Sequence, residues 1–218
     1  MAIARNIQVS IHGRYLVESP THSMPAGVLV GCHGYAESAE VQMQRLQTIP
    51  NAGRWLLVSI QGLHRFYRGR TGEVVASWMT RQDREFSIAD NVGYVTAVID
   101  EMAQELKVEL PILYAGFSQG VAMAFRAACL SQRRVAGIVA VGGEVPPELS
   151  AEALGRLPEA LIARGTGDTW YTEEQWHADQ VRLRAAGVDL RACGFEGGHE
   201  WHDDVNREAG ALLDRVTR

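Results

Sequence analysis

The stretch that decides the fold is ILYAGFSQGVAMA, residues 112–124. A short apolar run ends in Gly-Phe-Ser-Gln-Gly, residues 116–120, and a helical pattern of small residues follows. This order of strand, sharp turn and helix is the context that a G-x-S-x-G nucleophile elbow requires, because the turn must project the serine hydroxyl clear of the backbone. We therefore predict that Ser118 is a nucleophile. The alternative is a chance turn in front of a core helix.

Two strand ends further along the chain carry the partners that a serine nucleophile needs. Asp168 and His199 each follow an apolar segment and lie in a glycine-containing loop. A histidine accepts the serine proton, and a carboxylate orients that histidine. The alternatives are a turn-forming aspartate and a helix-capping histidine. Because the order serine, aspartate, histidine is the one found in α/β-hydrolases, we predict a triad of Ser118, Asp168 and His199, with Asp189 and Glu196 as alternative acids.

An upstream loop predicts where the oxyanion would be bound. A buried apolar run ends in HGYAE, residues 33–37. In α/β-hydrolases this loop supplies one backbone N–H of the oxyanion hole, and the residue after the nucleophile supplies the other. The expected donors are the amides of Gln119 and Tyr35, with Ala36 as the alternative to Tyr35, and His33 is expected to order the loop. An ordinary strand-to-helix turn is the competing interpretation.

The other apolar runs predict an α/β fold with a mostly parallel central sheet flanked by helices. The run at residues 27–32 is near-continuous, as a strand buried on both faces is, and residues 55–60 and 135–141 are likewise expected as buried strands. Further strands are expected at residues 159–164 and 188–193. At the N-terminus, residues 7–11 alternate apolar and polar side chains, which favours an antiparallel hairpin with residues 15–17. The length of 218 residues suits one α/β-hydrolase domain over 1–218.

Residues 61–86 form the longest stretch without a regular pattern, and a loop of this length is usually functional or mobile. Because it follows the carboxyl end of a strand, it is expected on the active-site side of the sheet. We predict it as a pocket wall or lid, with an apolar lining from Phe66, Tyr67, Trp78 and Met79. A core position is the alternative for Trp78. The arginines of this stretch are candidates to bind an anionic group, and a solvated surface loop is the alternative.

Composition narrows the function classes. The formal net charge of −5, without a charged tail, does not suggest nucleic-acid binding. No apolar run approaches the ~18 residues of a membrane span, and the N-terminus lacks a secretory h-region. With three cysteines read as buried free thiols, a cytoplasmic location is expected. His199 and His202 lack a third ligand at zinc-like spacing, so neither a metal nor another cofactor is expected.

These motifs resemble the phospholipase/carboxylesterase family of serine hydrolases, which includes acyl-protein thioesterases and small bacterial carboxylesterases. The resemblance covers nearly the whole chain and is carried by GFSQG at residues 116–120, His33-Gly34, Gly167-Asp168 and Gly198-His199. It implies a small-molecule ester substrate of small or medium acyl length, with a thioester, lysophospholipid or peptide as alternatives, and it is compatible with a homodimer.

One of the departures from the family pattern lies in the loop at residues 33–37. HGYAE at residues 33–37 stands where the family typically has His-Gly-x-Gly-Asp, which leaves the acyl preference open.

The competing hypothesis, from a non-enzymatic class of function, is a catalytically idle hydrolase fold used as a binding protein. Such a protein has no need of all three triad residues.

Overall fold

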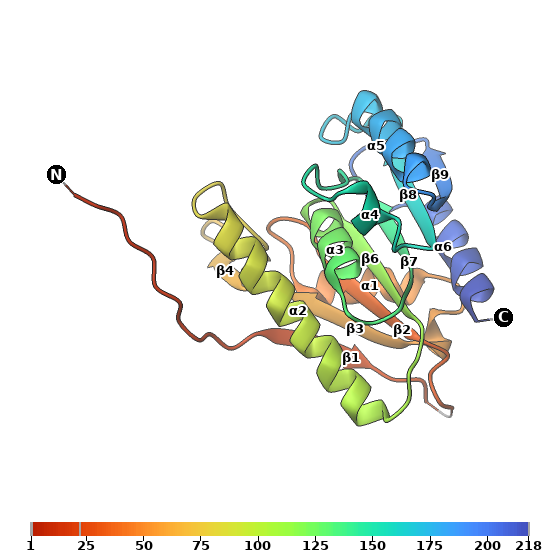
Figure 1. The fold of residues 1–218 in the computed structure, drawn as a ribbon, viewed down its shortest axis with the longest axis horizontal. Coiled ribbons are helices and arrows are strands. Elements are labelled where there is room, and N and C mark those ends of the chain that lie inside the picture. The colour runs from red at the N-terminus through yellow and green to blue at the C-terminus, as the bar shows by residue number, and fades with distance from the viewer. Residues whose placement is uncertain (1, 22, 218) are drawn as a thin grey trace.

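A seven-stranded sheet forms the centre of the computed structural model, which describes residues 2–21 and 23–217 (Figure 1). The strand order is β1-β3-β2-β6-β7-β8-β9, and every pairing is parallel except that of β1 with β3. The strands are β1 (Arg14–Glu18), β2 (Val28–Cys32), β3 (Leu56–Gln61), β6 (Ile112–Phe117), β7 (Val135–Val141), β8 (Glu159–Gly165) and β9 (Asp189–Phe195). The prediction of a mostly parallel α/β sheet is confirmed.

Helices cover both faces of this sheet, which explains the near-continuous apolar strands. In β2, Val28 and Val30 pack into one buried cluster and Leu29 into the other, as the alternation of side chains along a strand requires. The first cluster lies under α2 (Arg84–Leu106), α3 (Gln119–Leu130), α4 (Ala151–Leu154) and α5 (Glu173–Ala185). The second lies under α1 (Ala39–Thr48), the short 3₁₀ helix η1 (Ala52–Arg54) and α6 (Asp203–Val216).

The antiparallel pair lies at the N-terminal edge of the sheet, but its members differ from those expected. Strand β1 pairs with β3, with Tyr15 opposite Ile60, whereas residues 7–11 belong to no strand. The prediction that residues 7–11 form a hairpin with 15–17 was therefore wrong. Their apolar side chains have no layer to pack against and stay exposed. Figure 1 shows the N-terminal arm extending away from the body of the molecule.

The stretch 61–86 is more regular than the sequence indicated. It contains a second sheet of two antiparallel strands, β4 (His64–Tyr67) and β5 (Val74–Ser77). Each strand has only four residues, which is too short for a period-two pattern to stand out. The prediction of an irregular stretch was wrong, and helix α2 begins at Arg84, within residues 61–86.

Candidate active site

The elbow between β6 and α3 holds Ser118 in a conformation that its neighbours enforce. Ser118 has φ +52° and ψ −120°, outside the ordinary helix and strand regions, and such strain persists only where the surroundings over-determine it. A Cβ on Gly116 would lie 2.6 Å from the carbonyl oxygen of Gly120, and one on Gly120 would lie 2.1 Å from that of Cys32. Glycine at both positions therefore permits the close approach of strand and helix.

The three predicted triad residues form one hydrogen-bonded chain. His199 Nε2 lies 2.8 Å from Ser118 Oγ, and His199 Nδ1 lies 2.8 Å from Asp168 Oδ2. Because the carboxylate only accepts, Nδ1–H donates to Asp168 and leaves the Nε2 lone pair for the serine hydroxyl. This is the tautomer in which the histidine removes a proton from the serine.

Backbone donors hold the carboxylate of Asp168 in place. Asp168 is 4% exposed, and its Oδ1 accepts the amide N–H groups of Trp170 at 2.8 Å and Tyr171 at 3.1 Å. The other oxygen remains for the histidine, so burial leaves neither oxygen without a partner. The alternative acids Asp189 and Glu196 are both exposed, and neither forms a hydrogen bond with His199 in the described part of the chain.

The loop after β2 is ordered by a buried neutral histidine. His33 Nδ1–H donates to the carbonyl of Gly34 at 2.6 Å, and Nε2 accepts the amide N–H of Gly62 at 2.9 Å. Burial lowers the pKa of His33, because a charged imidazolium is costly away from water. His33 thus fixes the loop, in agreement with the sequence-based expectation.

The backbone amides of Tyr35 and Ala36 in this loop differ in their hydrogen bonding. The Ala36 amide donates to the carbonyl of Ala76 at 3.0 Å. Within residues 2–21 and 23–217, the Tyr35 amide donates no hydrogen bond. The amide of Gln119 opens α3, where the first N–H groups of a helix have no intrahelical acceptor. These contacts favour Tyr35 over Ala36 as the second oxyanion donor.

Glu37 anchors the same loop, a role that the sequence did not reveal. Its carboxylate accepts the Gly34 amide N–H at 2.7 Å and receives two bonds from Arg45, both 2.6 Å. Burial by itself would raise the pKa of Glu37, but the hydrogen bond and charge of Arg45 outweigh it, so the pKa is lowered. The Arg45 guanidinium also lies 4.0 Å from the centroid of the Phe117 ring. Glu37 thereby connects the loop to the elbow.

The side chain of Gln119 has a second unforeseen role. Its Oε1 accepts from Ser77 Oγ at 3.2 Å and from the Trp78 amide at 2.9 Å. Its Nε2 donates to the carbonyl of Met79 at 3.0 Å. Gln119 therefore clamps the segment that joins β5 to α2 onto the N-terminus of α3.

The predicted pocket residues divide into two groups. Trp78 is 0% exposed, stacks on His33 at 5.1 Å and donates through Nε1 to the His33 carbonyl at 2.8 Å. It is a core residue, and the prediction that it lines the pocket was wrong, because its apolar character suits a core equally well. Met79 and Phe66 are half-buried, Phe66 lies 5.7 Å from the Tyr35 ring, and Tyr67 is exposed.

Neither metal ligands nor a membrane span appear in the residues described. The structure there contains no group of three or more His, Cys, Asp or Glu side chains arranged to hold a metal ion. His202 caps α6 by accepting the Asp204 amide at 3.1 Å. None of the helices in this part of the chain is long and apolar enough to cross a bilayer.

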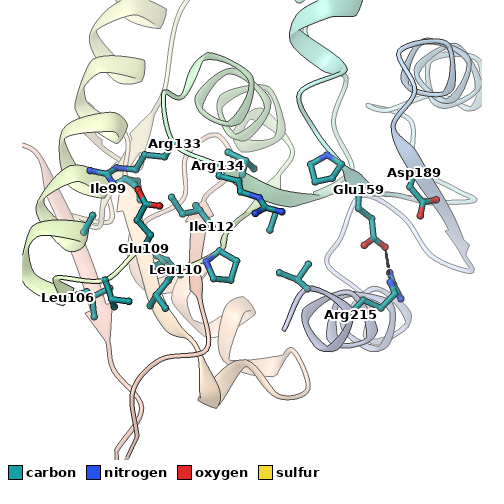
Figure 2. Close-up of a pocket in the computed structure, with 18 residues that line it drawn as sticks. Ile99, Leu106, Glu109, Leu110, Ile112, Arg133, Arg134, Glu159, Asp189 and Arg215 are labelled. Atoms are coloured by element: carbon teal, nitrogen blue, oxygen red, sulfur yellow. Dashed lines mark hydrogen bonds and ion pairs between the residues drawn. The ribbon is translucent and has the colours of Figure 1, made fainter. Parts of the chain in front are cut away.

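A cavity of about 620 Å³ lies at the end of the sheet opposite the triad, where strands β6 and β7 begin (Figure 2). Its lining includes Ile112 and Val135, which begin β6 and β7, and the Glu159–Arg215 ion pair. The triad follows the carboxyl ends of the strands, and a strand of six residues spans roughly 20 Å. This cavity is therefore separate from the candidate catalytic site.

Comparison with known proteins supports the family and the fold. The family model for phospholipase/carboxylesterase proteins matches residues 13–174. A carboxylesterase from Bacillus cereus superposes with a TM-score of 0.75 at 18% identity, over 94% of this chain and 94% of that chain. Acyl-protein thioesterase 2 from Zea mays gives 0.73 at 18% identity, over 95% and 100%. These likenesses show an α/β-hydrolase fold. No curated protein gave a significant match.

Proposed function

Because the chain belongs to the phospholipase/carboxylesterase family of hydrolases, we propose that it cleaves carboxylic esters of small or medium acyl groups through Ser118, His199 and Asp168. The observation that carries the proposal is the chain of two 2.8 Å contacts from Asp168 through His199 to Ser118. A hydroxyl on a strained turn, paired with a histidine that a buried carboxylate orients, is an activated nucleophile.

The mechanism follows from these contacts. His199 removes the Ser118 proton as the hydroxyl oxygen attacks the ester carbonyl carbon. The carbon–oxygen bond to the alcohol breaks, the alcohol leaves with the proton from His199, and an acyl-Ser118 ester remains. Water, deprotonated by His199, then attacks the acyl carbon. The bond from that carbon to Ser118 Oγ breaks, His199 returns the proton to Ser118, and the carboxylic acid leaves. Asp168 stabilises the imidazolium at each stage.

The amides of Tyr35 and Gln119 are the proposed donors to the oxyanion. The proposal is supported by the Ala36 amide being bonded to Ala76, while Gln119 opens a helix whose N-terminus favours negative charge. Each such donor contributes about 3 kcal/mol to transition-state stabilisation in comparable sites. Half-buried Met79 and Phe66 remain the proposed wall of the acyl pocket.

Thioester hydrolysis is the second candidate, because the same nucleophile, base and oxyanion donors act on a thioester carbonyl. A lysophospholipid or a peptide would use the same triad. An idle binding protein is disfavoured by the aligned triad, since aligned contacts are not needed for binding alone.

Covalent labelling tests the proposal. A fluorophosphonate should label the wild-type protein and Ser10→Ala, which changes an exposed serine in the N-terminal arm, but not Ser118→Ala. Ser118→Ala and His199→Ala should each abolish turnover of p-nitrophenyl butyrate while circular dichroism shows an intact fold. Labelling or full turnover in Ser118→Ala would show that another residue is the nucleophile. A series of p-nitrophenyl esters and the matching thioesters then measures acyl length and ester preference.

A homodimer remains a proposal, supported by the N-terminal arm. Ile7, Val9 and Ile11 are exposed at alternate positions, and β1 pairs only with β3 among the described strands. An open edge and an alternating apolar segment favour strand pairing between copies. Light scattering should give a dimer mass for the wild type and a monomer mass for Val9→Lys. A monomeric wild type would contradict the proposal.

A cytoplasmic location likewise stays a proposal, supported by three free thiols.

A further inference from the structure

A tryptophan beside the catalytic histidine has a function that the triad chemistry does not explain. Trp170 lies two residues after Asp168, and it is 80% exposed. Its ring centroid is 6.4 Å from that of His199, with 46° between the ring planes. Tryptophan is highly buried on average, so an indole in water beside a reacting group marks a binding surface.

The backbone that carries this indole is fixed on both sides. The Trp170 amide donates to Asp168 Oδ1 at 2.8 Å. The next residue, Tyr171, is 2% exposed, and its hydroxyl donates to Asp179 at 2.9 Å. Helix α5 follows, and Thr172 and Gln175 form a capping box at its start. The exposure of Trp170 therefore belongs to a rigid segment and not to a loose loop.

The chemistry of the reaction decides which part of the substrate meets Trp170. After the serine attacks, His199 Nε2 donates its proton to the departing oxygen or sulfur. The leaving group must therefore lie beside His199, while the acyl group stays attached to Ser118. Phe117 also borders the His199 ring, at 5.1 Å, but it is only 5% exposed. Trp170, by contrast, is exposed and close enough to the His199 ring to meet a leaving group held there.

We propose that Trp170 forms a leaving-group subsite that stacks on the flat ring of an aromatic alcohol or thiol. The inference rests on the proposed function, because it assigns the substrate class of the same site. In the acylation step the ester bond to the aromatic alcohol breaks, Ser118 Oγ takes the acyl group, and the former Ser118 proton passes through His199 to the alcohol oxygen. Free alcohol then leaves from the face of the indole.

Two butyrate esters of equal size test the subsite. Benzyl butyrate carries a planar ring and cyclohexylmethyl butyrate a puckered one, while both share the acyl group and have alkyl alcohols as leaving groups. The wild type should prefer the benzyl ester in kcat/KM by about twofold to twelvefold, the range expected for aromatic pairing. Trp170→Ala should bring this ratio close to one, and Trp170→Phe should keep most of it. Trp176→Phe, a substitution of a half-buried tryptophan in α5, should leave the ratio unchanged.

The outcomes separate this inference from the proposed function. If Ser118→Ala hydrolyses either ester at the wild-type rate, or the wild type hydrolyses neither, the proposed function fails and the subsite with it. If Ser118 is required but the ester ratio is the same in the wild type and Trp170→Ala, the subsite alone is refuted. A binding measurement supports the kinetics: benzyl alcohol should quench tryptophan fluorescence in the wild type more than in Trp170→Phe. Equal quenching in both proteins would count against stacking on Trp170.

Discussion

Replacing Gln119 by alanine tests whether the side chain of this residue, and not only its amide, supports the site. The substitution keeps the backbone N–H proposed as an oxyanion donor. It removes the acceptor of the Trp78 amide at 2.9 Å, the donor to the Met79 carbonyl at 3.0 Å and the acceptor of Ser77 Oγ at 3.2 Å. Residues 77–79 then lose these three hydrogen bonds to the N-terminus of α3.

The magnitude follows from the groups left without partners. Ser77 and Trp78 are buried, and Met79 is half-buried, so water replaces the lost bonds only in part. An unsatisfied buried polar group costs roughly 1–3 kcal/mol. The Trp78 amide is the group that loses its partner, because Ser77 Oγ still donates to the Met79 carbonyl at 2.8 Å. We expect the free energy of unfolding to fall by about 1–3 kcal/mol out of a typical total of roughly 5–15. The value of kcat should fall by less than the 10²–10³-fold seen when an oxyanion donor is removed.

Urea denaturation followed by circular dichroism measures the stability, and p-nitrophenyl butyrate turnover measures the activity. The matched control is Gln132→Ala, since Gln132 is exposed in the turn after α3. It should change the free energy of unfolding by less than about 0.5 kcal/mol, as surface substitutions usually do. A loss in Gln119→Ala no larger than that of the control would refute the clamp.

Three further changes test other parts of the site. Gly120→Ala should destabilise the fold by about 3 kcal/mol in thermal or urea melts and nearly abolish turnover, because its Cβ would lie 2.1 Å from the Cys32 carbonyl oxygen; a stable, active variant would contradict this close approach. Burial lowers the pKa of His33, so the stability it confers is complete above the unfolded pKa of about 6.5 and is lost as the pH falls below it. Between pH 7 and pH 5 the urea midpoint of His33→Gln should fall less than that of the wild type, and parallel curves would exclude His33 as the source. Asp168→Asn should lower kcat by about 10⁴-fold with little loss of stability, because an amide that donates to His199 Nδ1 selects the wrong tautomer. Steady-state kinetics and urea denaturation measure the two quantities. A fall in kcat accompanied by a large fall in stability would indicate a structural effect instead.

The features that the sequence predicted well are those set by chain order and strand ends. Ser118, Asp168 and His199 each follow the carboxyl end of a strand, and parallel strands bring those ends to one edge of the sheet. Their convergence therefore depends on topology alone. The apolar runs were equally informative, because a strand that is covered on both faces needs apolar side chains at consecutive positions.

The features that it missed depend on partners distant in sequence. Residues 7–11 have the alternation of a strand, but the pattern does not show whether a neighbouring strand or a covering layer exists. The Gln119 clamp joins residues about 40 positions apart, and no local period records such a contact. Trp78 illustrates the same limit, since a large apolar residue in an unassigned segment fits a pocket wall and a core alike.

The departure from the family pattern at HGYAE is better understood as a different way to hold the same loop. Glu37 reaches back to the Gly34 amide and pairs with Arg45 from α1, so its side chain ties down both ends of the turn that carries Tyr35. Arg45 in turn lies on the Phe117 ring, whose centroid is 5.1 Å from that of His199. A half-buried carboxylate without its cation would be costly, and Arg45 offsets that cost for Glu37. The loop proposed to bind the oxyanion and the proposed base His199 are thus joined by one network of contacts, which helps to fix the position of the Tyr35 amide relative to Ser118.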